Sequence, residues 1–404
     1  MAKGHIITGL DVGTSRIKTV VARKMSGEEP LEILGVSSFS SFGVRKGVVI
    51  DIDSVARNIQ ESTNEAIENS RQKIEDVYVG LGGSHIFSTP SRGVVAVSRA
   101  DQKISQEDID RVLQAAEAVS LPPNKEVLHT LPLNFTIDGE GGIKNALGMS
   151  GIRLEIEALL LGAFSPYIKN LTQAVLNSDL EINDLVISPL ASARAVLTPR
   201  QKELGVAVLD IGAGTTGLAV FREGDLVHLA IFPIGSAHIT NDIAIGLKTD
   251  IDIAERIKQE FGISSPQWLS KRDIVDLSSS LGTPLVFSRK ELAEIIEARL
   301  CEIFDLVLKE LKKLPGETLL PAGIVLTGGG VNLPKFVDLA KKELKLPCRL
   351  GFSQGFSKTV EDSSLSVACG LVLWGSDLEG KKRESFGGRG LGSKIKRAFR
   401  VFIP

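Results

Sequence analysis

Two segments far apart in the chain repeat one pattern, and this repeat constrains the fold more than any other feature. Residues 6–21 read as a β-branched strand, a tight turn and a second strand, and residues 206–221 follow the same plan. Both segments contain Leu-Asp-(Val or Ile)-Gly, which puts Asp11 and Asp210 in matching positions. The repeat predicts two related α/β halves, each beginning with a β-hairpin.

A second repeated feature follows each hairpin. Residues 77–83 and 324–330 each read as a strand that ends in consecutive glycines. Strands that alternate with helices are typical of an α/β fold, here with two sheets. Residues 84–163 and 237–316 have no counterpart in the other half, so each is interpreted as an inserted subdomain. Helical periodicity predicts helices over residues 54–71, 105–119, 290–314, 333–344 and 364–374. The second of these opens with Ser105-x-x-Asp108, a near-match to a capping box.

The composition is that of a folded chain. Of the 404 residues, 43% are apolar and 24% are charged, which is far from the composition of disordered proteins. With 47 basic against 49 acidic residues the net charge is −2, which argues against a chain built to coat nucleic acid. No uncharged apolar run approaches the ~18 residues of a spanning helix, and no signal peptide precedes Asp11. We therefore expect a cytoplasmic body whose membrane contact is peripheral.

The cysteines and histidines form no pattern that indicates a metal site, a disulfide framework or a catalytic triad. Cys301, Cys348 and Cys369 are widely spaced and lie in apolar stretches, so we expect each to be a small buried side chain. No two of the five histidines have the spacing of metal ligands. Structural roles are expected for all of them.

The turns of both hairpins have the chemistry of a phosphate site. Glycine lets the backbone pass close to an anion, and the amides and hydroxyls of such a turn can donate to phosphate oxygens. Asp11 and Asp210 are hard carboxylates at strand ends, placed to hold Mg²⁺ largely through its water shell, and Lys18 could reach a phosphate as a point charge. One such turn alone is more often an ordinary hairpin turn, but two copies favour a nucleotide site. The candidate phosphate-binding residues are Asp11, Gly13, Thr14, Ser15, Lys18, Asp210, Gly212, Gly214, Thr215 and Thr216.

These features resemble the actin/Hsp70/sugar-kinase ATPase superfamily, whose members hold nucleotide in the cleft between two halves. Within it, the chain is similar to the FtsA family of bacterial actin-like cell-division proteins. Three stretches carry that resemblance: residues 43–51 (GVRKGVVID), residues 104–123, and residues 147–155 (LGMSGIRLE). The resemblance covers essentially the whole chain. It implies an α/β, actin-like (ribonuclease H-like) two-lobed ATPase fold that binds ATP and Mg²⁺.

On this resemblance the chain divides into four subdomains and a tail. The first unrepeated segment falls where subdomain 1C belongs, and the second falls at subdomain 2B. The expected boundaries are 1–83, 164–198 and 352–378 for 1A, 84–163 for 1C, 199–236 and 317–351 for 2A, 237–316 for 2B, 379–390 for a linker, and 391–404 for an amphipathic membrane-targeting helix.

The superfamily also implies where the adenosine lies. An acid and a lysine three residues later frame the ribose and base, and Glu255 and Lys258 have that spacing, although an ordinary exposed helix pair has it too. Weaker candidates are Gly235, with the adjacent Ser236, and Asn241. The glycines Gly328, Gly329 and Gly330 complete the predicted adenosine site.

One position departs from the superfamily in a way that bears on hydrolysis. Hsp70-like members carry an acid before the second phosphate hairpin that helps to position the attacking water. This chain has Ser188 there, and a serine is a poor general base near neutral pH. We therefore assign no catalytic residue, with Asp210 as the one candidate, and expect at most a slow ATPase.

The end of the chain has a different character from the body. Residues 380–404 contain eight Lys or Arg and one acid, and at 100° per residue the last segment separates an apolar arc from a basic one. This composition is typical of an interfacial helix on anionic lipid, and FtsA-like proteins end in such a helix. A helix docked on the protein's own body and a nucleic-acid contact are the alternatives. The candidate membrane residues are Leu391, Lys394, Ile395, Lys396, Arg397, Phe399, Arg400, Phe402 and Ile403.

The FtsA resemblance implies a set of partners. Subdomain 2B would bind the C-terminal peptide of the tubulin-like protein FtsZ, with Arg272 and Lys290 as weak candidates for an acidic peptide. Subdomain 1C would contact the next subunit of an actin-like filament and other divisome proteins. The expected function is to tether FtsZ filaments to the inner face of the cell membrane at the division site. The alternatives are a PilM-like adaptor of type IV pilus assembly, which would lack the tail, and a sugar kinase or chaperone ATPase.

Overall fold

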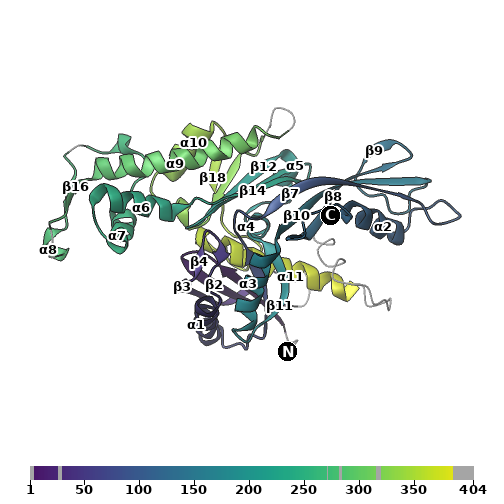
Figure 1. Ribbon diagram of the computed structural model, residues 1–404, viewed down its shortest axis with the longest axis horizontal. Helices are drawn as coiled ribbons and strands as arrows, with labels where there is room; N and C mark the ends of the chain where they lie inside the picture. The colour runs from purple at the N-terminus through teal and green to yellow at the C-terminus, as the bar shows by residue number, and fades with distance from the viewer. Residues whose placement is uncertain (1–3, 26–29, 271, 282–283, 315–319, 385–404) are drawn as a thin grey trace.

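The computed structural model describes residues 4–25, 30–270, 272–281, 284–314 and 320–384. Two five-stranded sheets form the two halves of the body, and two further units extend from it toward opposite ends of the long axis (Figure 1). The predicted amphipathic membrane-targeting helix, residues 391–404, lies outside the described residues. Within the described residues, no helix is long and apolar enough to cross a bilayer.

The first lobe contains the sheet β11-β6-β1-β2-β3. β1 and β2 form the predicted antiparallel hairpin, in which Asp11 pairs with Lys18, whereas β6 runs parallel to β1. The middle of each strand is buried without interruption, residues 7–10 in β1 and 19–22 in β2, because helices cover both faces of the sheet. The strands are β1 (His5–Val12), β2 (Arg16–Lys24), β3 (Glu32–Ser40), β6 (Asp76–Leu81) and β11 (Glu181–Ile187), and a small hairpin adds β4 (Val44–Arg45) and β5 (Val48–Val49).

The second lobe repeats this topology in the sheet β14-β13-β12-β17-β18. β12 and β13 form the second antiparallel hairpin and β17 runs parallel to β12, just as β6 runs parallel to β1. The internal repeat read from the sequence is therefore confirmed as a repeat of strand order and direction. The strands are β12 (Val206–Ile211), β13 (Thr216–Arg222), β14 (Asp225–Phe232), β17 (Ile324–Thr327) and β18 (Cys348–Leu350).

Helices complete both lobes. The predicted helix 54–71 is α1, which packs on β3 and β2 and begins at the N-cap Asp51, whose side chain accepts from the Ser54 amide. The predicted helix 333–344 begins later than expected because Gly329–Asn332 first forms a 3₁₀ turn. The helices of the lobes are α1 (Ile52–Ser70), α3 (Ser165–Leu176), α4 (Ser188–Val196), α5 (Pro199–Leu204), α10 (Phe336–Leu344) and α11 (Ser366–Glu384).

The segment predicted as the first insert, residues 84–163, contains a four-stranded sheet and one helix. The sheet has the order β7-β10-β8-β9, and α2 packs on it over a small apolar core of its own. The capping box expected at Ser105 is confirmed, since Ser105 and Asp108 bond reciprocally at the start of α2. The elements are β7 (Phe87–Ala96), α2 (Gln106–Glu117), β8 (Lys125–Ile137), β9 (Glu140–Ile143) and β10 (Arg153–Phe164).

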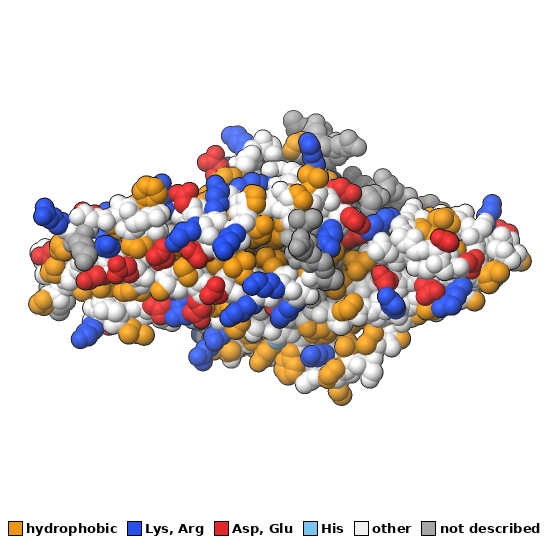
Figure 2. Space-filling view, turned by 90° about the horizontal axis from the view of Figure 1, so that it is seen from above, with side chains coloured by type: hydrophobic (Ala, Val, Ile, Leu, Met, Phe, Trp, Pro, Cys, Tyr) orange, Lys and Arg blue, Asp and Glu red, His pale blue; other side chains and the backbone are white. Residues whose placement is uncertain are grey.

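The segment predicted as the second insert, residues 237–316, is mainly helical. The predicted helix 290–314 is the long helix α9, which shares an apolar core with α6, α7 and the second lobe. Figure 2 shows basic and acidic side chains interspersed over the face of the molecule that it presents. The elements are α6 (Ser236–Leu247), α7 (Ile251–Phe261), β15 (Ile274–Asp276), α8 (Ser278–Leu281), β16 (Val286–Ser288) and α9 (Arg289–Leu311).

Helix α11 differs from the prediction at its C-terminal end. The expected helix 364–374 continues to Glu384, so the first residues of the segment predicted as a linker, 379–390, are helical. Small residues allow α11 to lie very close to the first lobe: a Cβ on Gly9 would collide with the Ala368 carbonyl. Gly375, just before the predicted linker, is a packing position on α11, where a Cβ would collide with the Tyr78 ring.

Candidate functional site

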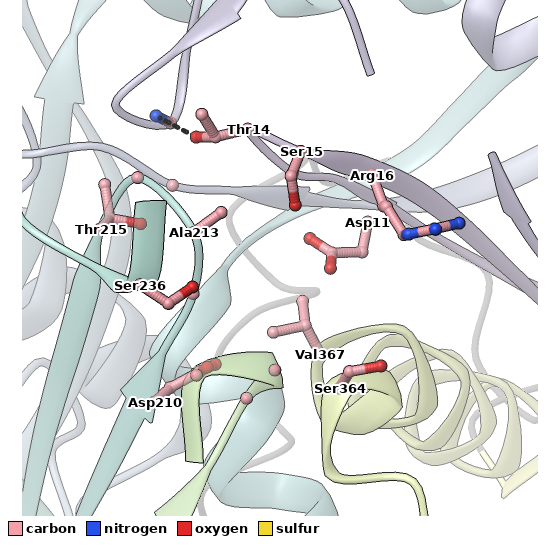
Figure 3. A pocket seen from close by; sticks show the side chains of 18 of the residues that line it. Asp11, Thr14, Ser15, Arg16, Asp210, Ala213, Thr215, Ser236, Ser364 and Val367 are labelled. Carbon is pink, nitrogen blue, oxygen red and sulfur yellow. Dashed lines mark hydrogen bonds between the residues drawn. The ribbon is translucent and has the colours of Figure 1, made fainter. Parts of the chain in front are cut away.

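A pocket lies between the two lobes, where the two hairpin turns approach each other (Figure 3). It encloses about 410 Å³, within the range typical of small-molecule sites. Its walls come from both hairpins, from the glycine turn after β17, from α7 and from the start of α11. The predicted convergence of the two turns on one cavity is therefore what the structure shows.

The two turns have the same local geometry. In the first, the Gly13 amide donates to the Arg16 carbonyl at 3.1 Å, and in the second the Gly212 amide donates to the Thr215 carbonyl at 2.9 Å. A third segment supports the first turn: the Gly47 amide donates to Thr14 Oγ1 at 3.0 Å, the bond drawn in Figure 3. Gly47 has φ +75°, which favours glycine, and this turn places its amide over Thr14.

Two acidic side chains occupy the strand ends at the base of the turns. Burial raises the pKa of Asp11, although the charge of Lys18 lowers it. Burial and the neighbouring charge of Asp11 raise the pKa of Asp210 to about 7, while Lys18 and a hydrogen bond from Ser192 lower it. Two desolvated carboxylates that repel each other are stabilised when a divalent cation joins them, and hard oxygen donors are the ligands that Mg²⁺ prefers. The residues present therefore fit a magnesium ion held by Asp11 and Asp210.

Lys18 is the cation nearest these carboxylates. It faces Asp11 across the β1–β2 ladder, and its Nζ donates to the Ser364 carbonyl at 2.5 Å. Ser364 and Val367 lie at the start of α11 and line the same pocket. The ammonium group thus lies where the first hairpin and the segment before α11 meet at the pocket.

The glycine turn after β17 closes another wall. Gly328 has φ +89°, and a Cβ there would collide with Asp210 Oδ1, so a side chain at this position would displace the carboxylate. Gly330 lies against Ile211 in the same way. Gly328 and Gly330 are required because this turn passes directly beside the second hairpin, whereas a Cβ on Gly329 would make only an ordinary contact with Ser364 at 3.6 Å.

The predicted adenosine pair sits in a bonded network on α7 and α6. Lys258 is buried, and its Nζ donates to Glu255 Oε2 at 2.6 Å, to Thr240 Oγ1 at 2.8 Å and to the Ser236 carbonyl at 3.2 Å. Burial opposes ionisation of Glu255, but Lys258, Thr240 and Gln259 together lower the pKa of Glu255 below its ordinary value. A buried lysine with three acceptors is unlike the exposed pair that the spacing alone also allowed. Both side chains line the pocket.

Ser188 is the residue that the resemblance to the superfamily places where an acid is expected. It begins α4, lines the pocket, and its Oγ would lie 3.3 Å from a Cβ built on Gly80. The acidic side chains that line the pocket are Asp11, Asp210 and Glu255, all of which have the partners described above. No further carboxylate among the described lining residues takes the place of the missing acid.

Three predicted residues do not line the pocket. The Thr216 hydroxyl is fully buried and donates to the Ile234 carbonyl at 2.8 Å. Asn241 is exposed on α6. Gly235 lies behind the second turn, where a Cβ would be 2.5 Å from the Gly212 carbonyl, so it shapes the turn rather than the cavity.

Several lining residues were not predicted. Arg16 directly follows the first turn, and its guanidinium donates to the Ser38 carbonyl at 3.1 Å. Its position beside Ser15 was the signal that could have identified it. Val12, Ala213 and Gly217 belong to the two hairpins themselves. The others come from segments without a phosphate-binding pattern, and only the fold brings them to the site: Gly47, Gly82, Pro189, Ile231, Gln259, Asn332, Leu333, Pro334, Ser364 and Val367.

Comparisons with known proteins agree on one family. A family model described as cell division protein FtsA matches residues 207–370, and a second, described as the SHS2 domain inserted in FtsA, matches residues 83–161. The cell division protein FtsA of Pseudomonas aeruginosa is 38% identical over 377 residues, which cover 92% of this chain and 89% of that protein. Relatives at this identity and coverage share the fold and the family.

Solved structures show the same fold at lower identity. The PilM-PilN type IV pilus biogenesis complex contains a chain with 19% identity and a TM-score of 0.64, covering 91% of this chain and 98% of that one. MreB 5 of Spiroplasma citri bound to AMPPNP has 14% identity and a TM-score of 0.57, covering 94% and 98%. These likenesses establish the actin-like two-lobed architecture and nothing finer.

Proposed function

The chain belongs to the FtsA family of bacterial cell-division proteins, and from this premise we propose that it binds MgATP between its lobes and attaches FtsZ filaments to the cytoplasmic membrane. The observation that carries the nucleotide part is the convergence of two matching turns, from opposite lobes, on one pocket. The MreB 5 neighbour of the same fold is described with a bound ATP analogue.

In this proposal the phosphates lie between the two turns. The amides of both turns and the hydroxyls of Thr14, Ser15 and Thr215 donate to phosphate oxygens. Asp11 and Asp210 hold the magnesium ion, which neutralises charge on the phosphates, and Lys18 exchanges the Ser364 carbonyl for a phosphate oxygen. Glu255 accepts from the ribose hydroxyls, while Lys258 holds Glu255 in place.

We propose that hydrolysis is slow and that nucleotide acts mainly as a structural ligand that draws the lobes together and supports actin-like filaments. The support is Ser188, since a serine cannot supply the ~10²–10⁴-fold typical of general base catalysis. A nucleotide that contacts both lobes binds their closed arrangement more tightly than the open one, and this difference in affinity favours the closed arrangement.

The membrane part of the proposal rests on the last segment, residues 391–404. Each basic residue near an anionic leaflet adds ~1 kcal/mol, but a segment this short must become helical as it binds, so attachment is weak for one molecule and strengthens with filament length. A PilM-like adaptor would not require this segment. The amphipathic tail and the FtsA relatives therefore favour the cell-division adaptor.

The two inserts are proposed as the partner-binding units. The second, 237–316, carries the exposed apolar side chains Ile274 and Val286 on the β15–β16 hairpin and Trp268 beside Lys335, and exposed apolar side chains suit a short peptide such as the FtsZ C-terminus. The first, 84–163, is proposed to contact the next subunit and other divisome proteins. The two inserts extend toward opposite ends of the long axis, as head-to-tail assembly requires (Figure 1).

Two measurements test the proposal. Titration calorimetry of the full chain should detect MgATP binding, and Asp210→Ala should abolish it. Flotation with vesicles of anionic lipid should carry the full chain and added FtsZ upward, whereas a chain ending at Glu384, which retains all of α11, should leave both behind. Vesicles of neutral lipid are the control. Failure to bind any adenine nucleotide would overturn the nucleotide part of the proposal. Equal flotation of the two chains would overturn the membrane part.

A further inference from the structure

The first insert belongs by sequence to the first lobe but is bonded to the second. Lys144, directly after β9, donates to Asp225 Oδ2 at 2.5 Å, and Asp225 is the first residue of β14 in the second lobe. Ser88 of β7 donates from its hydroxyl to the Leu229 carbonyl of β14 at 2.9 Å. β14 is the edge strand of its sheet, and β7 and β8 lie against it. The insert therefore covers an edge that would otherwise be open.

An apolar layer lies beneath these polar contacts. Leu131 and Leu161 from the insert share one cluster of buried residues with Leu226 and Leu229 of β14 and with the core of the first lobe. The base of the insert also touches α11, where His129 meets Trp374 edge to face at a centroid distance of 5.5 Å. The insert thus contacts both lobes at once.

The charges around Asp225 explain why a lysine is needed. Asp225 lies beside Glu203 and Glu223, and burial and these two acids raise its pKa, whereas the bond to Lys144 lowers it. The backbone holds the acids together, because the Glu223 amide donates to the Glu203 carbonyl at 3.2 Å. Lys144 is held in turn by its own unit, donating to the Leu133 carbonyl of β8 at 3.2 Å. Without Lys144 this corner of the second lobe has three neighbouring carboxylates and no cation from the insert.

We propose that Lys144 and Asp225 form a latch that makes the first insert move with the second lobe, although the chain connects the insert to the first. The nucleotide pocket lies between the lobes, so a closure of the lobes carries the latched insert to a new angle relative to the first lobe. This coupling to nucleotide rests on the proposed function, but the latch itself does not. Breaking the latch weakens the hold of the insert on the second lobe, while the apolar layer and the Ser88–Leu229 bond remain, so arrangements in which the insert has moved away from β14 become more populated.

Distances between spin labels test the latch directly. Labels are placed at three exposed positions: Glu107 on α2 reports on the insert, Glu61 on α1 on the first lobe, and Lys341 on α10 on the second lobe. The background chain carries Cys301→Ser, which removes the one half-buried thiol. Without nucleotide, the wild type should give one narrow 107–341 distance. Lys144→Ala should increase the population at longer distance up to about fivefold, the range of a partly exposed ion pair. The double variant Lys144→Asp with Asp225→Lys should restore the narrow distance.

A matched control separates the latch from general loosening of the insert. Arg92 and Glu157 also form an ion pair at 2.5 Å, but both belong to the insert. Arg92→Ala should leave the 107–341 distance unchanged. An unchanged distance in Lys144→Ala, or no recovery in the charge-reversed pair, would overturn the latch.

A separate measurement tests whether the movement of the insert is coupled to nucleotide binding. On addition of MgATP to the wild type, the 107–61 distance should change while the 107–341 distance stays constant. The opposite result, in which 107–61 is constant and 107–341 changes, would show that the insert follows the first lobe and would overturn the coupling. If calorimetry finds no MgATP binding, the proposed function fails, yet the nucleotide-free distances still decide the latch.

Discussion

The side chain of Thr14, in the first turn, lies directly against the backbone of Gly214, in the second. A Cβ built on Gly214 would lie 2.5 Å from Thr14 Oγ1 and 3.0 Å from Thr14 Cβ. The two turns therefore touch, and the space for phosphate is defined by how closely they approach. The Gly47 amide holds the Thr14 hydroxyl in this position from the other side.

Gly214→Ala is expected to weaken ATP binding by about tenfold to a hundredfold, because overpacking of a tight contact costs ~1–3 kcal/mol and here the cost is met by separating the turns. Calorimetric titration measures this change in affinity. Combining Gly214→Ala with Thr14→Gly, which removes the whole opposing side chain, should recover part of the affinity. The control is Gly141→Ala in the first insert, which does not line the pocket and whose Cβ would make an ordinary contact with Thr136 at 3.4 Å; its affinity for ATP should equal that of the wild type. Equal affinities for Gly214→Ala and the wild type would show that the turns separate without cost.

Ser188→Glu is expected to raise the rate of ATP hydrolysis, because it restores a base at the pocket wall where the superfamily carries one. The wild type should turn over below about one per second, the low end of typical enzyme rates. A gain of at least about tenfold is expected from a partly positioned base. Ser188→Gln has nearly the same shape without the charge and should remain slow. A fast wild type, or equal rates for the Glu and Gln variants, would contradict the assignment.

Glu255→Ala is expected to remove discrimination between ATP and 2′-deoxy-ATP. In the wild type the carboxylate, oriented by Lys258, accepts from the ribose, and a charged hydrogen bond contributes about 1.5–3 kcal/mol, so deoxy-ATP should bind roughly tenfold to a hundredfold more weakly. In the variant the two nucleotides should bind equally. Arg256→Ala, on the same helix but paired with Glu260, serves as the control and should retain the discrimination.

His85→Gln is expected to change how stability depends on pH. The His85 ring lies edge-on to Tyr167 at 4.9 Å, both ring nitrogens are buried without a partner among the described residues, and burial lowers the pKa from 6.5 to about 4. Between these values the unfolded chain binds a proton that the folded one does not, so the wild type loses stability as the pH falls from 6.5 toward 4.

Urea unfolding measures this dependence. From about pH 7.5 to about pH 4.5 the free energy of unfolding should decrease more for the wild type than for His85→Gln, which has no proton to bind in this range. His5→Gln, at the exposed start of β1, should follow the wild type. Parallel curves for the wild type and His85→Gln would show that the ring is charged in the folded protein.

Features that depend on residues close together in the chain could be predicted from the sequence. The hairpins, the capping box at Ser105 and the strands ending in glycines each depend on bonds within a few residues, and the structure confirms them. The error at Thr216 is instructive, because side chains alternate along a strand and Thr216 faces the buried carbonyl of Ile234 while Thr215 faces the pocket. Period-two alternation would have separated the two threonines.

The sequence by itself determined that there are two matching turns, that each carries a carboxylate, and that a basic amphipathic segment ends the chain, because turn chemistry and helical periodicity act over a few residues. Only the tertiary structure decided that Ser364 meets Lys18, that α11 continues to Glu384, and that the first insert rests on the second lobe through Lys144 and Asp225. These contacts join residues far apart in the chain. Which surfaces meet depends on the total apolar area that the whole chain buries, and no pattern of a few neighbouring residues determines that total.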